Sequence, residues 1–199
     1  MYIPDHFAVS DKAEIHAFIR AHGFGQLVSV VAGRLFSSHI PVILSDCETK
    51  LLCHLAKQNP QARELTEQEV MITLQGPHGY VSPSWYETPG VPTWNYQAVH
   101  IYGHCRLLTD ADELATLLRK LTMRYESTIE EPWDGHYRAA LLEAIVGIEI
   151  HISEIQCKYK LSQNRSREDQ RRIFNQLTSS GSNALAQQML RSSEIQGSY

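Results

Sequence analysis

The first forty residues carry two different spacings of apolar positions. Asp11 and Glu14 have the spacing of a capping box, and the apolar residues that follow recur at helical intervals, which predicts a helix ending near Gly23. Beyond it, two apolar runs at 26–31 and 34–40 flank an Ala-Gly pair. Two short apolar runs joined by such a pair are typical of a β-hairpin.

The remaining apolar runs predict more strands than helices. Strands are expected at 51–55, 70–75, 94–108 and 145–152, with a further strand reaching about residue 160. Helices are expected at 59–68, after Thr109, at 137–144, after Ser166 and in a last short segment near the C-terminus. Strands that do not alternate regularly with helices argue against βαβ units. The pattern therefore predicts a mainly β fold, a small antiparallel barrel with peripheral helices.

The stretch 76–92 is expected to form loops, because it is dense in Gly, Pro and Ser. It also contains Tyr80, Trp85 and Tyr86, and Trp94 follows shortly after. Aromatic side chains on rigid loops commonly frame a pocket or a subunit interface. We therefore expect 82–96 to lie at or near the interface of a homodimer, since a monomer rarely leaves such surfaces exposed.

Composition narrows the class of protein. The chain has 199 residues, of which 43% are hydrophobic and 20% charged, as in a folded protein of one domain or one domain with a helical tail. Its formal net charge of −4 argues against a general nucleic-acid coat. No signal peptide or membrane span is visible, and the four cysteines show no CxxC spacing. A soluble cytoplasmic protein with reduced thiols and no membrane partner is the expectation.

Familiar catalytic motifs are absent from the sequence. It contains no HExxH, GxSxG, Walker loop or GxGxxG. His100 and His104 lie on one face of a predicted strand, ~13 Å apart at the rise of a strand, which is too far to share an ion. No bound metal and no catalytic residue are therefore predicted.

Two segments could bind an anion. The stretch 54–63 runs from a strand end into a predicted helix start at Asn59, where free N–H groups and the charge of Lys57 would favour a phosphate. A plain capped surface helix explains the same residues. The segment 158–172 carries six basic and two acidic residues. Its charged and amide side chains could bind a phosphate or the polar edge of a ring, and a solvent-exposed strand end explains the same residues equally well.

Several longer motifs resemble a known family. They are Met1-Tyr-Ile-Pro-Asp-His-Phe7, His54-Leu-Ala-Lys-Gln-Asn-Pro60, Gln75-Gly-Pro-His-Gly-Tyr-Val-Ser-Pro-Ser-Trp-Tyr86, Val91-Pro-Thr-Trp-Asn-Tyr96 with Val99-His100 and Tyr102-Gly103, and Lys160-Leu-Ser-Gln-Asn-Arg165. Together they resemble the PaiB family over nearly the whole chain. That resemblance implies an FMN-binding negative transcriptional regulator with the split β-barrel of pyridoxamine-phosphate oxidases and flavin reductases. It also implies a homodimer with flavin sites at the interface.

The resemblance further implies a division of the chain and a set of cofactor contacts. Residues 1–160 would form the flavin-binding split barrel, and 161–199 a basic segment with a helical C-terminal tail packed on it. The flavin phosphate would lie near Lys57 and Asn59. The residues implied to contact FMN are Ser37, Ser38, His39, His54, Lys57, Asn59, Gln75, Lys160, Ser162, Gln163 and Arg165. Ala62 and Ser37 depart from the more usual aromatic residue and Ala of the family.

Three functions remain open at this stage. The first is a flavin-binding regulator, whose contact with a DNA operator would use the basic segment 158–172 or a partner, since no helix-turn-helix is evident. The same charges could equally serve the flavin and the terminal helix alone. The second is a flavin-dependent oxidoreductase resembling NAD(P)H:flavin reductases. The third is a haem-binding split-barrel protein.

Overall fold

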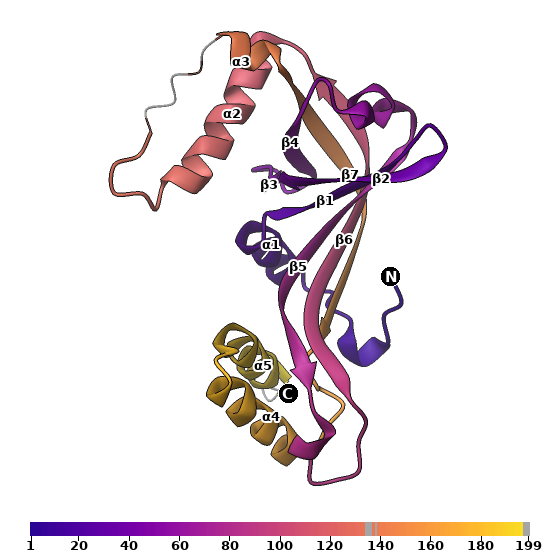
Figure 1. Cartoon of the computed structure of the whole chain (residues 1–199), viewed down its shortest axis with the longest axis vertical. Coiled ribbons are helices and arrows are strands. Elements are labelled where there is room, and N and C mark those ends of the chain that lie inside the picture. Colours follow the sequence, from indigo (N-terminus) through magenta and orange to yellow (C-terminus); the bar gives the residue numbers. More distant parts are fainter. Residues whose placement is uncertain (134–136, 138, 197–199) are drawn as a thin grey trace. The chain divides into compact units, whose positions relative to one another are not determined.

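The computed structural model describes residues 1–133, 137 and 139–196. Seven strands form one sheet in the order β2-β1-β5-β6-β7-β4-β3 (Figure 1). The strands are β1 (Phe24–Val31), β2 (Arg34–Pro41), β3 (Ile43–Leu44), β4 (Lys50–Ala56), β5 (Glu69–Val81), β6 (Thr93–Leu108) and β7 (Ile145–Lys160). The helices are α1 (Lys12–Ala21), α2 (Ala111–Glu126), α3 (Ala139–Glu143), α4 (Arg167–Ser179) and α5 (Asn183–Gln196). The prediction of a mainly β fold with peripheral helices is confirmed.

The chain divides into two compact units. The first unit comprises residues 1–15, 75–99 and 156–199, and the second comprises 16–74 and 100–155. Strands β5, β6 and β7 each contribute residues to both units. The boundary near residue 160 that the resemblance implies stays a prediction.

The hairpin of the second unit forms as the sequence predicts. β1 and β2 pair in antiparallel register from Phe24↔Pro41 to Val31↔Arg34. The two turn residues Ala32 and Gly33 have φ angles of 49° and 76°, which is the left-handed pair that a tight hairpin turn requires. β2 is an edge strand of the sheet and ends at Pro41, where the missing N–H breaks no ladder bond.

The sheet of the second unit curls into an incomplete barrel. β2 approaches β4 at the other side of the curl, although β2 pairs only with β1 within the described residues. Leu27, Leu51, Ile72 and Ile148 are fully buried in its core. A sheet that curls without closing is the split β-barrel that the resemblance implies, and this prediction is confirmed.

Helix α2 covers part of the second unit with one apolar stripe. Leu114, Leu117, Leu118 and Leu121 pack with Leu108 into a buried cluster. The helix is capped by Asp110, which accepts two backbone N–H bonds, and not by the Thr109 that the sequence suggested. An aspartate carboxylate offers the better acceptor at that position.

Several predicted elements differ from the structure. The helix expected at 59–68 is replaced by two 3-10 turns, Pro60–Arg63 and Leu65–Glu67. The loop expected from residue 76 begins later, because β5 continues to Val81, and the two strands expected at 145–160 are one strand. The helix expected at 137–144 is α3, but Arg138 lies outside the described residues.

The first unit contains the C-terminal helical hairpin. α4 and α5 bury Ile173, Leu177, Leu185 and Met189. Gly79 on β5 lies directly against this apolar face, since a Cβ at that position would be 3.0 Å from Leu185 Cδ2. The glycine therefore allows the helices to sit close to the strand. In the part of the chain that the structure describes, none of the helices has the length and apolar character of a membrane span.

Candidate flavin site

Ser38 and Asn59 meet in the second unit. Ser38 lies on β2 and Asn59 at the start of the turn after β4, and Asn59 Nδ2 donates to Ser38 Oγ at 2.8 Å. The other end of the same amide, Oδ1, accepts the backbone N–H of Gln61 at 3.0 Å and so caps the 3-10 turn. Two of the residues implied to contact FMN, Ser38 and Asn59, therefore contact each other, and the Asn59 cap serves a 3-10 turn and not a long helix. The dipole contribution to anion binding is correspondingly small.

Gln61 fixes this turn against the hairpin. Its side chain is fully buried, and Nε2 donates to Leu27 O at 3.1 Å and to Ser29 Oγ at 2.8 Å on β1. Its Oε1 is buried with no hydrogen-bond partner among the described residues. Sequence reasoning missed Gln61, because an isolated glutamine after a proline carries no signal of a buried contact with another element.

Lys57 and His54 lie at the end of β4. Lys57 is exposed, and its ammonium has no hydrogen-bonding or ion-pair partner in the described part of the chain, while its backbone N–H donates to Ala144 O at 2.9 Å. His54 pairs with Gly147 across the β4–β7 ladder. Burial lowers the pKa of the His54 imidazole, and its Nδ1 is buried with no hydrogen-bond partner in the described part of the chain. The ring is therefore neutral near pH 7 and retains one unused hydrogen-bonding atom.

Ser37 and His39 face away from Ser38. Side chains alternate along a strand, and both residues are exposed while Ser38 is partly buried. Ser37 Oγ donates to Gln26 Oε1 at 3.3 Å, and the His39 ring stacks on Phe24 with a centroid separation of 6.4 Å. β2 thus divides its three predicted residues between two faces, with Ser38 on the face of Asn59.

The other predicted residues belong to the first unit. Gln75 is exposed on β5. Lys160 Nζ donates to Thr93 Oγ1 at 2.5 Å and to Trp94 O at 2.6 Å. Burial, with smaller contributions from Lys158 and Arg165, lowers the pKa of Lys160. Its ammonium therefore holds the first two residues of β6 through these hydrogen bonds.

The turn after β7 uses its polar side chains internally. Ser162 is buried with a φ of 68° and exchanges hydrogen bonds with Asn95 at 2.9 and 3.1 Å. Gln163 Oε1 accepts the N–H of Leu161 at 2.7 Å. The guanidinium of Arg165 lies 4.2 Å from the centroid of the Tyr86 ring. Ser162, Gln163 and Arg165 thus hold the turn in its observed shape, and their contact with a flavin stays a prediction.

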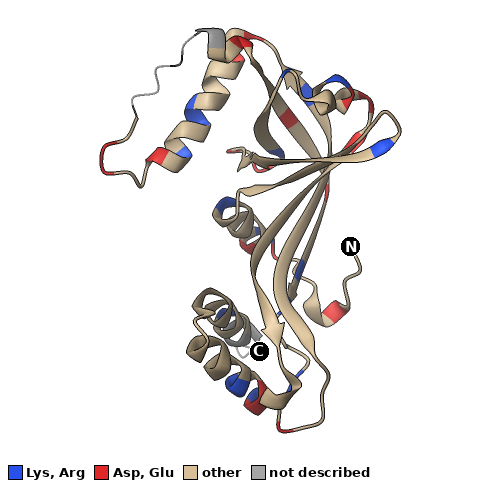
Figure 2. Ribbon diagram, in the orientation of Figure 1, with Lys and Arg blue, Asp and Glu red and all other residues tan. Residues whose placement is uncertain are grey.

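Among the described residues, two of the six basic side chains in the segment 158–172, both on α4, are paired with carboxylates. Lys158 is buried among the rings of Tyr2, Phe7 and Tyr96 at 5.3–5.9 Å and donates to the Tyr2 carbonyl. On α4, both Arg171 and Arg172 pair with Glu168, at 2.8 and 3.2 Å. Figure 2 shows this alternation of basic and acidic residues at the start of α4.

Arg172 also pairs with Glu87, a residue far earlier in the chain. The pKa of Glu168 is lowered, chiefly by its hydrogen bond from Arg171 and then by its hydrogen bond from Arg172. Of the three arginines of α4, only Arg167 has no carboxylate partner among the described residues.

The donor set of the second unit fits a phosphate-bearing cofactor. A lysine ammonium and a histidine nitrogen that both lack a partner among the described residues, and a carboxamide anchored by a serine hydroxyl, lie on β2, β4 and the turn between β4 and β5. Within the described residues no cluster of three or more His, Cys, Asp and Glu side chains could hold a metal.

Comparison with known sequences gives a consistent result. Residues 1–154 match the family described as "Putative FMN-binding domain". The chain is 40% identical over 185 residues to Protease synthase and sporulation protein PAI 2 of Bacillus subtilis, covering 89% of each chain. It is 32% identical to an uncharacterized protein of Emericella nidulans, covering 92% of this chain and 93% of the relative.

Solved structures with little sequence identity share the fold. A flavocytochrome from Azotobacter vinelandii superposes with a TM-score of 0.65 at 17% identity, covering 84% of this chain and 77% of the other. The FAD and heme binding protein from Mycobacterium smegmatis gives a TM-score of 0.62 at 16% identity, covering 81% and 77%. At these identities the likeness concerns the arrangement of strands and helices alone.

Proposed function

The chain belongs to the PaiB family of proteins with an FMN-binding domain, and from this premise we propose that it acts as a flavin-dependent negative regulator of transcription. FMN is the cofactor of the family, and the fold is the flavin-binding split barrel. The observation that supports the site is the exposed ammonium of Lys57, which has no partner among the described residues and stands two positions before Asn59, the residue that donates to Ser38. When bound, FMN supplies a phosphate anchor and a redox-active ring.

The residues of the second unit have distinct roles in this proposal. Lys57 binds the phosphate, because a flexible ammonium at an exposed strand end can meet a dianion at little desolvation cost. Asn59 and Ser38 fix the turn that carries Lys57, and Gln61 anchors that turn to β1. His54, neutral near pH 7, would lie near the flavin ring, as the resemblance implies.

The phosphate role of Lys57 is tested by comparing FMN with riboflavin, which lacks the phosphate. Lys57→Ala should weaken FMN binding by about 10- to 100-fold, the range for a hydrogen bond to a charged group, and leave riboflavin binding unchanged. Flavin fluorescence quenching gives both affinities. Lys12→Ala, which removes another exposed lysine, is the matched control and should bind both flavins as the parent does. If Lys57→Ala binds FMN as tightly as the parent does, the phosphate does not lie at Lys57.

A homodimer is part of the proposal. Trp94 and Tyr80 are 54% and 45% exposed on neighbouring strands, with ring centroids 6.2 Å apart. An aromatic surface of this kind on one sheet face supports burial against a second copy of the chain.

A flavin-dependent oxidoreductase is the second candidate function. It is favoured by the ion pairs of α4, because arginines that are already paired with Glu168 and Glu87 have less charge to offer a DNA phosphate. Two measurements separate the candidates: operator binding as a function of salt, and NAD(P)H oxidation by the FMN-loaded protein. Salt-sensitive operator binding without turnover supports the regulator. NAD(P)H turnover without DNA binding supports the enzyme.

A further inference from the structure

A pocket lies in the second unit apart from the residues assigned to flavin. It has a volume of about 290 Å³, at the small end of the range for ligand pockets. Its wall is formed by the end of α1, by β3 with its flanking residues, and by the last two turns of α2, and its lining residues are Arg20, Val42, Ile43, Leu44, Asp46, Lys120, Met123 and Arg124. None of the eleven residues implied to contact FMN is among them.

The floor of the pocket is apolar. Val42, Ile43 and Leu44 line it from β3 and the residue before it, and Met123, which is 65% exposed, lines it from α2. An exposed methionine is an adaptable apolar surface that can close over a ligand. The body of a ligand held here is therefore apolar, and the volume limits it to about ten heavy atoms at roughly 30 Å³ for each water-sized group.

The rim of the pocket carries an unbalanced positive charge. Lys120 Nζ pairs with Asp46 Oδ2 at 2.7 Å, and Arg20 pairs with Glu48 outside the pocket. Arg124 donates to the backbone carbonyl of Arg20 and has no carboxylate partner in the described ranges. Among the described residues, two of the three cations thus have a carboxylate partner, and the guanidinium of Arg124 has none.

From this balance we infer that the pocket binds a small amphipathic carboxylate. Its single negative charge would pair with Arg124, whose planar fork matches a carboxylate in two parallel hydrogen bonds. Its hydrocarbon part would cover Val42, Ile43, Leu44 and Met123. A dianion would exceed the one uncompensated charge, and a neutral alcohol or amide would leave it unpaired.

Octanoate is the probe that tests this inference on the FMN-loaded full chain. Isothermal titration should show octanoate binding, with octanamide, which has the same chain and no charge, at least ten-fold weaker. Inorganic phosphate, the charge without the chain, should also be at least ten-fold weaker. Absence of octanoate binding at 10 mM would overturn the inference, as would equal affinity for octanamide or for inorganic phosphate.

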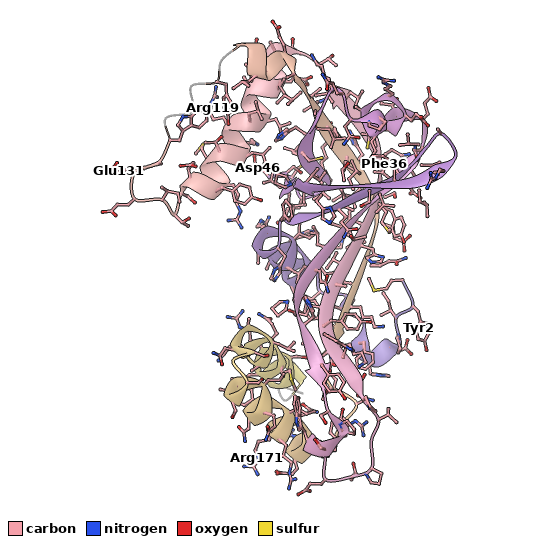
Figure 3. The ribbon with its side chains drawn as sticks, in the orientation of Figure 1. Tyr2, Phe36, Asp46, Arg119, Glu131 and Arg171 are labelled. Carbon is pink, nitrogen blue, oxygen red and sulfur yellow. The ribbon has the colours of Figure 1, made fainter. Side chains whose placement is uncertain are left out.

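Variants on α2 assign the binding to this pocket. Arg124→Met should weaken octanoate about 10- to 100-fold, and Met123→Glu, an exposed substitution that adds a negative charge at the rim, should do the same. Arg119→Met is the matched control, since Arg119 lies on the same helix outside the pocket (Figure 3). Unchanged affinity in Arg124→Met would overturn the assignment. Release of FMN by octanoate would also overturn it, because the pocket would then be the flavin site.

Discussion

Asp169 offers a sharp test of how α4 holds the loop that follows β5. Its side chain is 1% exposed, and its carboxylate accepts the Glu87 N–H at 2.8 Å and the Thr88 hydroxyl at 3.2 Å. Its own N–H is capped by Ser166 Oγ at 3.1 Å. One buried carboxylate therefore joins the first turn of α4 to a loop more than eighty residues earlier.

Asp169→Ala leaves both loop donors without an acceptor. A hydrogen bond to a charged group contributes about 1.5–3 kcal/mol, and the two bonds share one group, so we expect a loss of about 3 kcal/mol. For a chain of this size about 1 kcal/mol corresponds to roughly 2–4 °C, so the melting temperature should fall by about 6–12 °C. Asp169→Asn keeps one carbonyl oxygen and should lose about half as much.

Thermal unfolding followed by circular dichroism measures the shift, and hydrogen exchange adds a local readout. The Glu87 amide should exchange faster in Asp169→Ala, since its acceptor is gone. Asp112→Ala removes an exposed acid from the first turn of α2 and serves as the control, with a loss below about 1 kcal/mol. If Asp169→Ala melts within 1 °C of the parent and the Glu87 amide is unchanged, the carboxylate does not hold this loop.

Two further predictions concern the surface. Iodoacetamide should modify Cys47 before the other three cysteines, at a rate that rises as pH increases through about 7. The reason is that hydrogen bonds from Ser45 and Thr49 stabilise the thiolate and lower the pKa of Cys47 to about 7, whereas burial raises the pKa of the other three thiols. Peptide mass spectrometry measures the order of labelling, and simultaneous labelling of all four cysteines would contradict the prediction. Sedimentation at micromolar concentration should show a dimer that Trp94→Ser weakens, and a monomeric parent would refute the proposed homodimer.

Local signals account for the parts of the fold that the sequence predicts well. The β1–β2 hairpin and helix α1 depend on residues within a few positions of each other, so the local sequence pattern predicts both. The predicted helix at Asn59 is wrong, because the local signal of an Asn cap followed by Pro marks a helical start and does not fix the length or type of the turn that follows. β5 continues through Gly79, which lies against Leu185 of α5, and no local pattern reveals this contact between distant segments.

The candidate site divides in the same way. Lys57 and Asn59 stand in one short motif, and the resemblance identifies both, whereas Gln61 owes its role to Leu27 and Ser29, more than thirty residues earlier. The sequence alone does not distinguish which of Ser37, Ser38 and His39 faces Asn59. Only the strand register separates the one that meets Asn59 from the two that face the other way.

The charge of the segment 158–172 shows why a count along the sequence overstates an electrostatic surface. Counting gives a net excess of four positive charges, which suggests contacts with nucleic acid. In the folded first unit Lys158 is enclosed by aromatic rings, and Arg172 is paired with Glu87, which a local count does not include. A phosphate that approaches α4 must compete with those carboxylates for Arg171 and Arg172. Arg167 has no carboxylate partner among the described residues, so any operator contact by this helix would depend most on Arg167.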